Sequence, residues 1–352
     1  MRSGNFFPKT LTSWLPGKRK HPPPTEQPEP TLAAAPLLLA ESTARRREAM
    51  QQASEAQEWQ AAASQAAELC DLLLVLGRWR ELLATTAQGK AWLEQRDDPL
   101  IRLYLHAQEA MAQHRLGALQ QSRLLFQEAE KWQTDRQTGY HWLIGLPGKG
   151  YCDLMMDQAK VASVWEMVLH RSHYSQKISR NLFAIGLDLQ TQGRALAALG
   201  QQETAAASFK QAVTTLRKAN RRAFLPELLR HQAELVRRQE GTQAAWPILT
   251  EALAIAVAEG LKPAEAEARL LEAHLLLDEK RLEAAAAVLT SLETLLAELE
   301  YGQQTVAVHL LRARLLRQQG RQQEADHWQA QAVQRMETQQ QWGVMWNPAL
   351  KQ

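Results

Sequence analysis

The sequence predicts an all-α protein built as a solenoid, in which helix–turn–helix pairs stack one on the next. Ala, Leu, Gln, Glu and Arg, which all favour helices, dominate the 352 residues, whereas Val and Ile are scarce. Apolar residues recur at three- and four-residue spacing from about residue 41 onward. A set of small and apolar residues also returns at fixed offsets along the chain, which is the pattern of a repeat protein.

Residues 1–40 are predicted to form a disordered, basic, proline-rich tail. Eight of the 14 prolines lie within residues 1–36, and proline both fixes φ and removes a hydrogen-bond donor. The same stretch carries five basic residues against two acidic ones, which accounts for the whole net charge of +3. The rest of the chain is therefore formally neutral, and this weighs against nonspecific binding to nucleic-acid phosphates.

The tail contains an apolar cluster beside a basic run, which makes it a candidate docking motif for a partner or for a membrane surface. The alternative is a solvated linker. The residues of this candidate motif are Phe6, Phe7, Trp14, Lys18, Arg19 and Lys20.

Helices are expected across residues 41–340, with breaks at glycine and proline positions. Glu41 opens the first of these helices. Residues 341–352 contain Trp342 and Trp346, and we expect them either to cap the last repeat or to form a tail with a second partner-binding motif.

The repeat is clearest around Gly193. Further small or apolar residues follow it at offsets of 3, 7, 12, 16 and 19, namely Leu196, Gly200, Ala205, Phe209 and Ala212. A small first residue lets two helices approach closely, and a glycine at offset 7 supplies the positive φ that ends the first helix. The alanine at offset 12 lies where the second helix crosses the first. Equivalent first positions are Cys70, Ala110, Cys152, Ala233, Ala273 and Ala313.

This pattern resembles the tetratricopeptide repeat family, which implies a right-handed α-solenoid with repeats of about 34 residues. A narrower resemblance covers residues 120–300 and rests on four segments, Leu125–Glu130, Tyr151–Met155, Gln192–Ala195 and Ala223–Pro226. These segments look like the repeat arms of bacterial multidomain signalling ATPases of the STAND type. This resemblance implies a sensor or partner-binding arm, and it implies no ATPase activity because the sequence carries no nucleotide-binding module.

No catalytic, cofactor-binding or metal-binding residue is predicted. The segment Gly145–Gly150 lacks the first glycine and the Ser or Thr of a phosphate-binding loop, so we expect a flexible loop between helices. Cys70 and Cys152 occupy the small first position and are expected to be buried thiols. His170 and His173 are expected at the surface near a helix end. Two cysteines fit a reduced cytoplasm, and no apolar stretch is long enough to span a membrane.

In this architecture the first helix of each pair lines the concave side, and offsets −3, +1, +4 and +5 from the first position should face it. These positions are rich in arginine in the C-terminal half, and arginine pairs bidentately with carboxylate or phosphate. We therefore expect a groove for an acidic or C-terminal peptide, with a solvated charged face as the alternative. The candidate groove residues are Arg194, Arg230, Glu234, Arg237, Arg238, His274, Arg314 and Arg317.

Together these features predict a cytoplasmic protein–protein interaction scaffold or adaptor that has no catalytic activity and no cofactor, and that binds a protein or peptide partner. One alternative is a regulatory or sensor subunit of a separately encoded ATPase, protease or transcription complex. Another is nucleic-acid binding through the arginine-rich helices and the basic tail, which the neutral body makes the less favoured reading. Gln-rich helices around Gln318–Gln341 leave self-association open.

Overall fold

The computed structural model describes residues 35–136 and 142–339, and within these ranges the chain is helical with short connections and no strand. The candidate motif in the tail and the C-terminal segment 341–352 lie outside the described residues. The α-helices are α1 (Ala35–Glu55), α2 (Trp59–Leu76), α3 (Trp79–Leu93), α4 (Pro99–Arg115), α5 (Leu119–Arg136), α6 (Gly145–Asp157), α7 (Val161–Tyr174), α8 (Leu182–Ala198), α9 (Gln202–Lys218), α10 (Leu225–Glu240), α11 (Thr242–Ala258), α12 (Lys262–Asp278), α13 (Leu282–Leu299), α14 (Thr305–Gln318) and α15 (Gln322–Gln339). Three short helical segments join some of them, η2 (Ser175–Ser179), η3 (Arg222–Phe224) and η4 (Gly302–Gln304).

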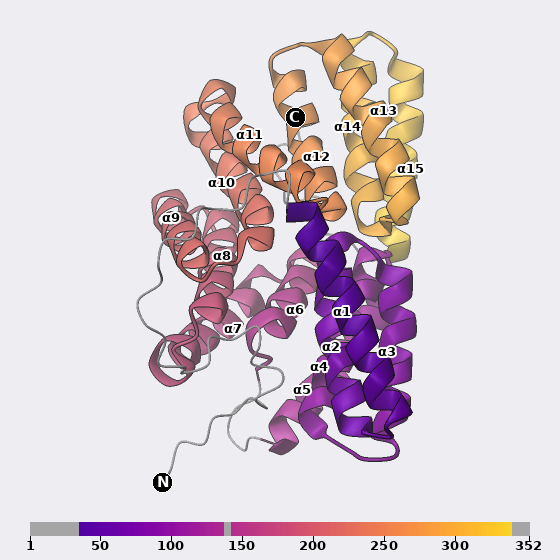
Figure 1. The fold of residues 1–352 in the computed structure, drawn as a ribbon. Helices are drawn as coiled ribbons and strands as arrows, with labels where there is room; N and C mark the ends of the chain where they lie inside the picture. Colours follow the sequence, from indigo (N-terminus) through magenta and orange to yellow (C-terminus); the bar gives the residue numbers. More distant parts are fainter. Residues whose placement is uncertain (1–34, 137–141, 340–352) are drawn as a thin grey trace.

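The fold is a right-handed α-solenoid of tetratricopeptide-like helix pairs, as the sequence predicts (Figure 1). In the described residues, α2 to α15 form seven consecutive antiparallel pairs, and α1 packs against the first of them. Every predicted first position lies on the first helix of a pair and is buried. The repeat is longer than expected, because these positions are 40 to 42 residues apart and not about 34.

The turns between paired helices show why glycine is common there but not required. Gly77, Gly117 and Gly200 all have positive φ. Lys280 adopts φ 57° at the equivalent place, where the peptide N–H of Arg281 donates to the carbonyl of Leu276 at 2.9 Å. Hydrogen bonds of this kind at the end of the helix offset the modest cost of placing a non-glycine residue in the left-handed conformation.

Close helix contact depends on the small first positions. A Cβ added to Gly193 would lie 2.6 Å from the ring of Phe209, so the aromatic residue at offset 16 occupies the space that glycine leaves. In the next repeat, Ala233 stands at the first position and Leu249 at offset 16, and both are completely buried. The offsets found in the sequence are therefore pairs of residues that share one volume.

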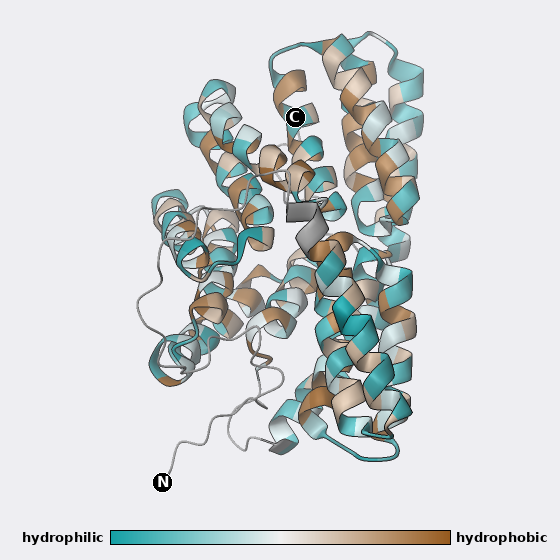
Figure 2. Cartoon of the chain, in the orientation of Figure 1, coloured by the Kyte–Doolittle hydropathy of each residue, from teal (hydrophilic) through white to brown (hydrophobic). Residues whose placement is uncertain are grey.

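Two boundaries differ from the sequence-based prediction. Helix α1 begins at Ala35, before Glu41, and is dominated by hydrophilic residues, as Figure 2 shows. The expected loop at Gly145–Gly150 is wrong, since α6 begins at Gly145 and its first turns are buried. A helix with two further glycines persists there because Gly148 and Gly150 touch neighbouring groups, and an added Cβ at Gly150 would meet Met111 at 2.5 Å.

The first and last repeats pack against each other, so the solenoid closes on itself. Figure 1 shows the indigo helices α1–α3 abutting the orange and yellow helices α12–α15. One hydrophobic core joins Leu73 and Trp79 from the N-terminal end to Leu276 and Tyr301 from the C-terminal end. The rings of Trp79 and Tyr301 meet edge to face with centroids 4.7 Å apart. We call this contact between α2–α4 and α12–η4 the ring closure.

Backbone contact at the ring closure is tight. A Cβ added to Gly302 would lie 2.2 Å from the carbonyl oxygen of Leu116, a distance that no side chain tolerates. On the outer side of the ring closure, Arg80 and Glu300 form an exposed ion pair at 2.5 Å. No helix in the described part of the chain is both long enough and apolar enough to cross a bilayer.

The substitution Gly302→Ala should weaken the ring closure, because the backbone of η4 must move away from Leu116. We expect a loss of about 1–3 kcal/mol in unfolding free energy, and faster amide exchange in α3 and η4. Hydrogen-exchange mass spectrometry measures both regions. Glu298→Ala on the exposed side of α13 is the control, and equal exchange in the two variants would contradict a tight closure.

Candidate functional site: the axial face

The first helices of the pairs turn polar side chains toward the axis of the ring, and these side chains form two groups. We call Arg115, Lys149, Asp153, Arg194, Glu227 and Glu267 the axial network. We call Glu234, Arg237, Arg238, His274, Asp278 and Arg314 the arginine cluster. Both groups consist of charges from successive repeats, which is the arrangement expected of a concave face in a solenoid.

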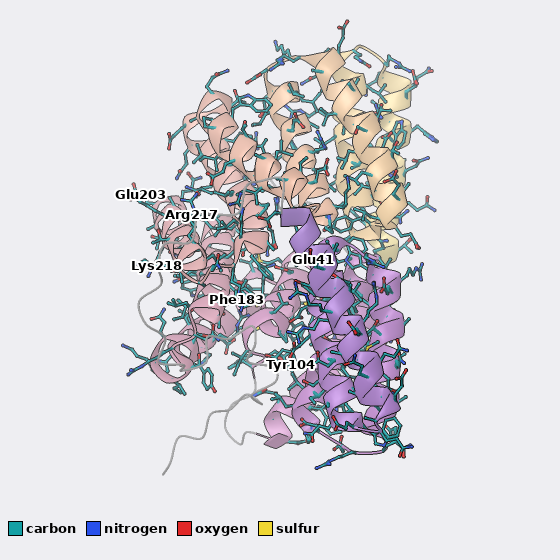
Figure 3. The ribbon with its side chains drawn as sticks, in the orientation of Figure 1. Glu41, Tyr104, Phe183, Glu203, Arg217 and Lys218 are labelled. Atoms are coloured by element: carbon teal, nitrogen blue, oxygen red, sulfur yellow. The ribbon has the colours of Figure 1, made fainter. Side chains whose placement is uncertain are left out.

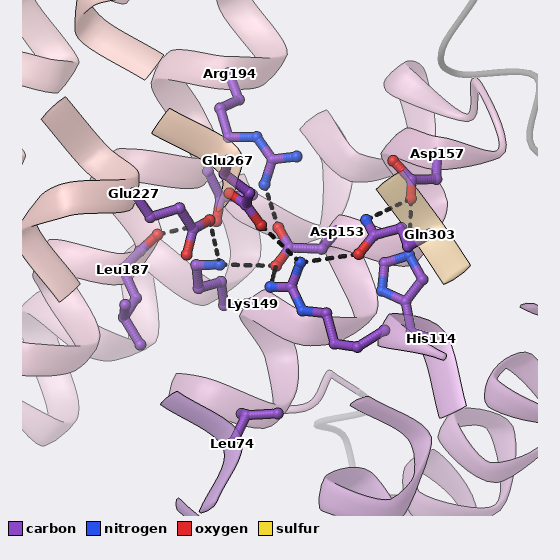
Figure 4. A network of polar contacts seen from close by, with 12 residues as sticks. Leu74, His114, Lys149, Asp153, Asp157, Leu187, Arg194, Glu227, Glu267 and Gln303 are labelled. Carbon is purple, nitrogen blue, oxygen red and sulfur yellow. Dashed lines mark hydrogen bonds and ion pairs between the residues drawn. The ribbon is translucent and has the colours of Figure 1, made fainter. Parts of the chain in front are cut away.

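Lys149 is the centre of the axial network (Figure 4). Its ammonium group donates to Asp153 at 2.7 Å and to Glu227 at 2.7 Å, and only 3% of the side chain is exposed. Arg194 pairs with the second oxygen of Asp153. This one lysine therefore ties α6 to α10, while Asp153 ties α6 to α8.

Arg115 extends the network across the ring closure. Its guanidinium donates to Glu267 at 3.1 Å, to the hydroxyl of Tyr301 at 2.8 Å and to Gln303 at 2.9 Å. The side-chain amide of Gln303 donates in turn to Asp157 at 2.7 Å. The charges on the axis therefore link the N-terminal helix α4 directly to α12 and η4.

Burial and pairing together set the protonation states. Burial alone would raise the pKa of Asp153, but Lys149 and Arg194 outweigh it and lower the pKa to about 2. The pKa of Glu227 is likewise held well below its usual range, chiefly by Lys149. Burial lowers the pKa of His231 well below its ordinary value, so a neutral imidazole stands beside Glu227. Asp153 and Glu227 are therefore ionised at neutral pH.

A cavity of about 70 Å³ lies beside the axial network, between Met111, Leu146, Phe224 and Pro263. A water molecule needs roughly 10–15 Å³ of such space, so the cavity has room for a few waters. It is too small for a peptide side chain with its backbone. In the closed ring, the centre of the axis is therefore filled by the protein's own charges.

The arginine cluster is formed by α10, α12 and α14. Arg237 and Arg314 both donate to Asp278 at 2.6 Å, so one carboxylate serves two guanidinium groups from different repeats. Glu234 accepts from Arg237 at 2.9 Å and from Arg238 at 2.8 Å. The cluster therefore holds three guanidinium groups against two carboxylates.

His274 lies in the middle of the arginine cluster. Its side chain is buried, and its Nδ1 has no hydrogen-bond partner. Burial lowers its pKa to about 4, an effect that Glu234 opposes and that Arg237 and Arg314 reinforce. The cluster thus contains a neutral imidazole with an unused polar atom.

The structure divides the predicted groove residues between these two groups. Arg194 belongs to the axial network, and Arg230 lies next to it with its Nε 3.4 Å from Glu267. Arg317 stands apart on the exposed edge, 3.8 Å from Asp326 of α15. The remaining predicted residues, Glu234, Arg237, Arg238, His274 and Arg314, come together in the arginine cluster.

The sequence analysis missed the N-terminal half of the axial face, although the same rule would have found it. Offsets −3, +1 and +5 from Cys152 are Lys149, Asp153 and Asp157, and offset +5 from Ala110 is Arg115. Glu227 and Glu267 both stand six residues before a first position, an offset that the rule did not include.

The cysteines and the surface histidines are where the sequence places them. Cys70 and Cys152 are buried and free, and burial raises the pKa of the Cys152 thiol to about 11. His170 and His173 are exposed at the end of α7, and His170 stacks on Trp142. Arg171 donates to the sulfur of Cys152 at 3.1 Å and opposes the rise in the pKa of this thiol, but the effect of burial is larger.

Comparison with known proteins supports the fold. No protein-family model and no curated protein matches the sequence. Among solved structures, a Rap protein complexed with competence and sporulation factor matches with a TM-score of 0.62 and 12% identity, over 89% of this chain and 89% of that one. The apo form of RapI matches with a TM-score of 0.51 and 13% identity, over 74% of this chain and 93% of that one. At this identity the likeness concerns the fold alone.

Replacing Lys149 should destabilise the protein strongly, because Asp153 and Glu227 would face each other without the ammonium group between them. We expect Lys149→Met to cost about 3–5 kcal/mol at neutral pH. The cost should shrink near pH 4, where the unpaired carboxylates of the variant take up protons. Urea unfolding at both pH values measures this difference. Lys218→Met, on the exposed surface of α9 (Figure 3), is the control and should change little.

His274 should make stability depend on pH. In the unfolded chain its imidazole titrates near 6.5, whereas in the folded protein its pKa is about 4. Between these values the unfolded chain binds the proton and the folded protein does not, so stability falls as the pH drops from about 6.5 to about 4. The full effect is about 3 kcal/mol.

Unfolding free energies of His274→Leu, measured across this range, should show a shallower slope than those of the unmodified protein. The exposed His173→Gln variant is the control and should keep the original slope. A slope that is unchanged by His274→Leu would contradict a buried neutral imidazole at this position.

Proposed function

We propose that this protein is a non-catalytic, protein-binding helical repeat that captures an acidic segment of a partner at its arginine cluster. One observation carries the proposal: Asp278 alone accepts from both Arg237 and Arg314 at 2.6 Å. Because the cluster holds three guanidinium groups against two carboxylates, an incoming carboxylate would balance its excess positive charge, and arginine binds carboxylate in a bidentate geometry. The unused Nδ1 of His274 offers a further hydrogen bond at the same place.

The arginine cluster suits this role better than the axial network. Lys149, at the centre of the axial network, is 3% exposed, whereas the arginine and glutamate side chains of the cluster are between 11% and 24% exposed, as are Arg115, Arg194 and Glu227 at the edge of the network. The cavity at the axial network has no room for a peptide. The fold supports the same role, since a structure with a similar fold is that of a Rap protein in complex with competence and sporulation factor.

The alternatives from the sequence have less support. Nucleic-acid binding requires an excess of cations facing phosphates, but the chain after residue 36 carries as many acidic as basic residues. A role as the regulatory or sensor subunit of an ATPase, protease or transcription complex is a narrower form of the same proposal. It depends on which partner is captured.

Reversing charges in the arginine cluster should abolish capture of the partner. We expect the Arg237→Glu and Arg314→Glu double variant to lose about tenfold or more of the partner that the unmodified protein retains from native lysate. Arg217→Glu, on the outer side of α9 (Figure 3), is the matched control and should retain it. Quantitative mass spectrometry measures the retained protein, and circular dichroism checks the fold of each variant.

Equal capture by the double variant and the control would contradict the arginine cluster as the binding surface. A partner that is lost only when residues 1–40 are removed would assign recognition to the tail.

A further inference from the structure

A second groove lies on the other side of the C-terminal repeats, between α13, α14 and α15. Its volume is about 410 Å³, which is within the range of small-ligand and side-chain pockets. Leu296, Val308 and Trp328 form apolar walls, and Leu116 reaches the groove from the end of α4. The groove therefore stands beside the ring closure and away from the arginine cluster.

The charges that line this groove do not cancel. Glu293 is paired with Arg312 at 2.7 Å, and Glu300 is paired with Arg80 at 2.5 Å, and neither of these arginines lines the groove. Both carboxylates thus already have an arginine partner outside the groove. Arg335 of α15 is the cation that is left in the lining.

Arg335 has no counter-charge in the described part of the chain. Its side chain is half-buried, and its Nε is buried without a hydrogen-bond acceptor. Within residues 35–136 and 142–339, no carboxylate forms an ion pair with it. A guanidinium withdrawn from water without a counter-charge is costly, so the site favours an anion that would fill this place.

A second polar atom in the groove is also unused. The ring of His309 meets the ring of Trp328 edge to face, with centroids 4.9 Å apart. This contact fixes the imidazole against the apolar wall and leaves its buried Nδ1 without a partner. The groove thus combines an aromatic wall, an unpaired guanidinium and an unpaired imidazole nitrogen.

We propose that this groove is a docking site for a partner segment in which an aromatic or aliphatic side chain stands next to a carboxylate. The apolar side chain packs on Trp328 and Leu296, and the carboxylate pairs with Arg335. A basic segment would place a like charge beside Arg335, and a wholly apolar one would leave the guanidinium without a carboxylate. This proposal is independent of the arginine cluster. The C-terminal half of the ring would then have two separate binding surfaces, the arginine cluster and this groove.

The probe is a short fluorescein-labelled peptide of Leu, Phe, Asp and Glu, and its matched control has Lys in place of both acidic residues. Fluorescence anisotropy with the full chain should show saturable binding of the acidic peptide only. We expect Arg335→Glu to weaken this binding about tenfold or more. Arg321→Glu, an exposed arginine at the start of α15, should bind as the unmodified protein does.

Three results would overturn the proposal. They are absence of saturable binding, binding that Arg335→Glu leaves unchanged, and displacement of the probe by a peptide of residues 340–352, which would make the chain's own C-terminal segment the occupant. Arg335→Ala, which removes the charge without reversing it, should also weaken binding. The thermal midpoint of each variant is compared with that of the unmodified protein, so that lost binding is not mistaken for misfolding. Capture at the arginine cluster should be unaffected by Arg335→Glu, so the two surfaces can fail separately.

Discussion

The arrangement of this protein depends on the contact of Tyr301 with the first repeats. Its ring packs on Trp79, while its hydroxyl donates to Glu267 and accepts from Arg115. A solenoid normally ends in exposed apolar faces that need capping repeats. Here the last repeats cover the first, and the two ends share one hydrophobic core. The ring closure therefore replaces part of the capping with contacts between residues that are far apart in sequence.

Closure also determines how the axial charges behave. Once α4 and α12 face each other across a narrow axis, the side chains between them are buried, and each buried charge must find a partner. Lys149 and Arg115 meet this requirement by bridging carboxylates on separate helices. In the arginine cluster, Asp278 serves two arginines, and three guanidinium groups stand against two carboxylates. The first group stabilises the ring, and the second is suited to a partner.

Much of the fold follows from residue spacing. Small residues at the first positions and larger ones at offset 16 fill one volume between helices, so Gly193 with Phe209 was sufficient to locate a helix pair. Spacing does not determine the curvature that adds up over seven pairs, and so the ring closure was not predicted. Residue spacing also did not predict the helix that begins at Gly145. Its glycines pack against Met111, which is distant in sequence, and against the carbonyl of Leu143, and these contacts exist only in the folded chain. The arginine cluster was found by its offsets, whereas the pairing with Asp278 required the structure.

The most direct test of a closed ring is a distance measured between its two ends. Spin labels at Ala84→Cys on α3 and Glu298→Cys on α13 occupy exposed positions on the helices that meet at the closure, and the native cysteines are buried. Pulsed electron spin resonance should give one short and narrow distance distribution in the unmodified background. A long or broad distribution would show an open solenoid and would contradict the account.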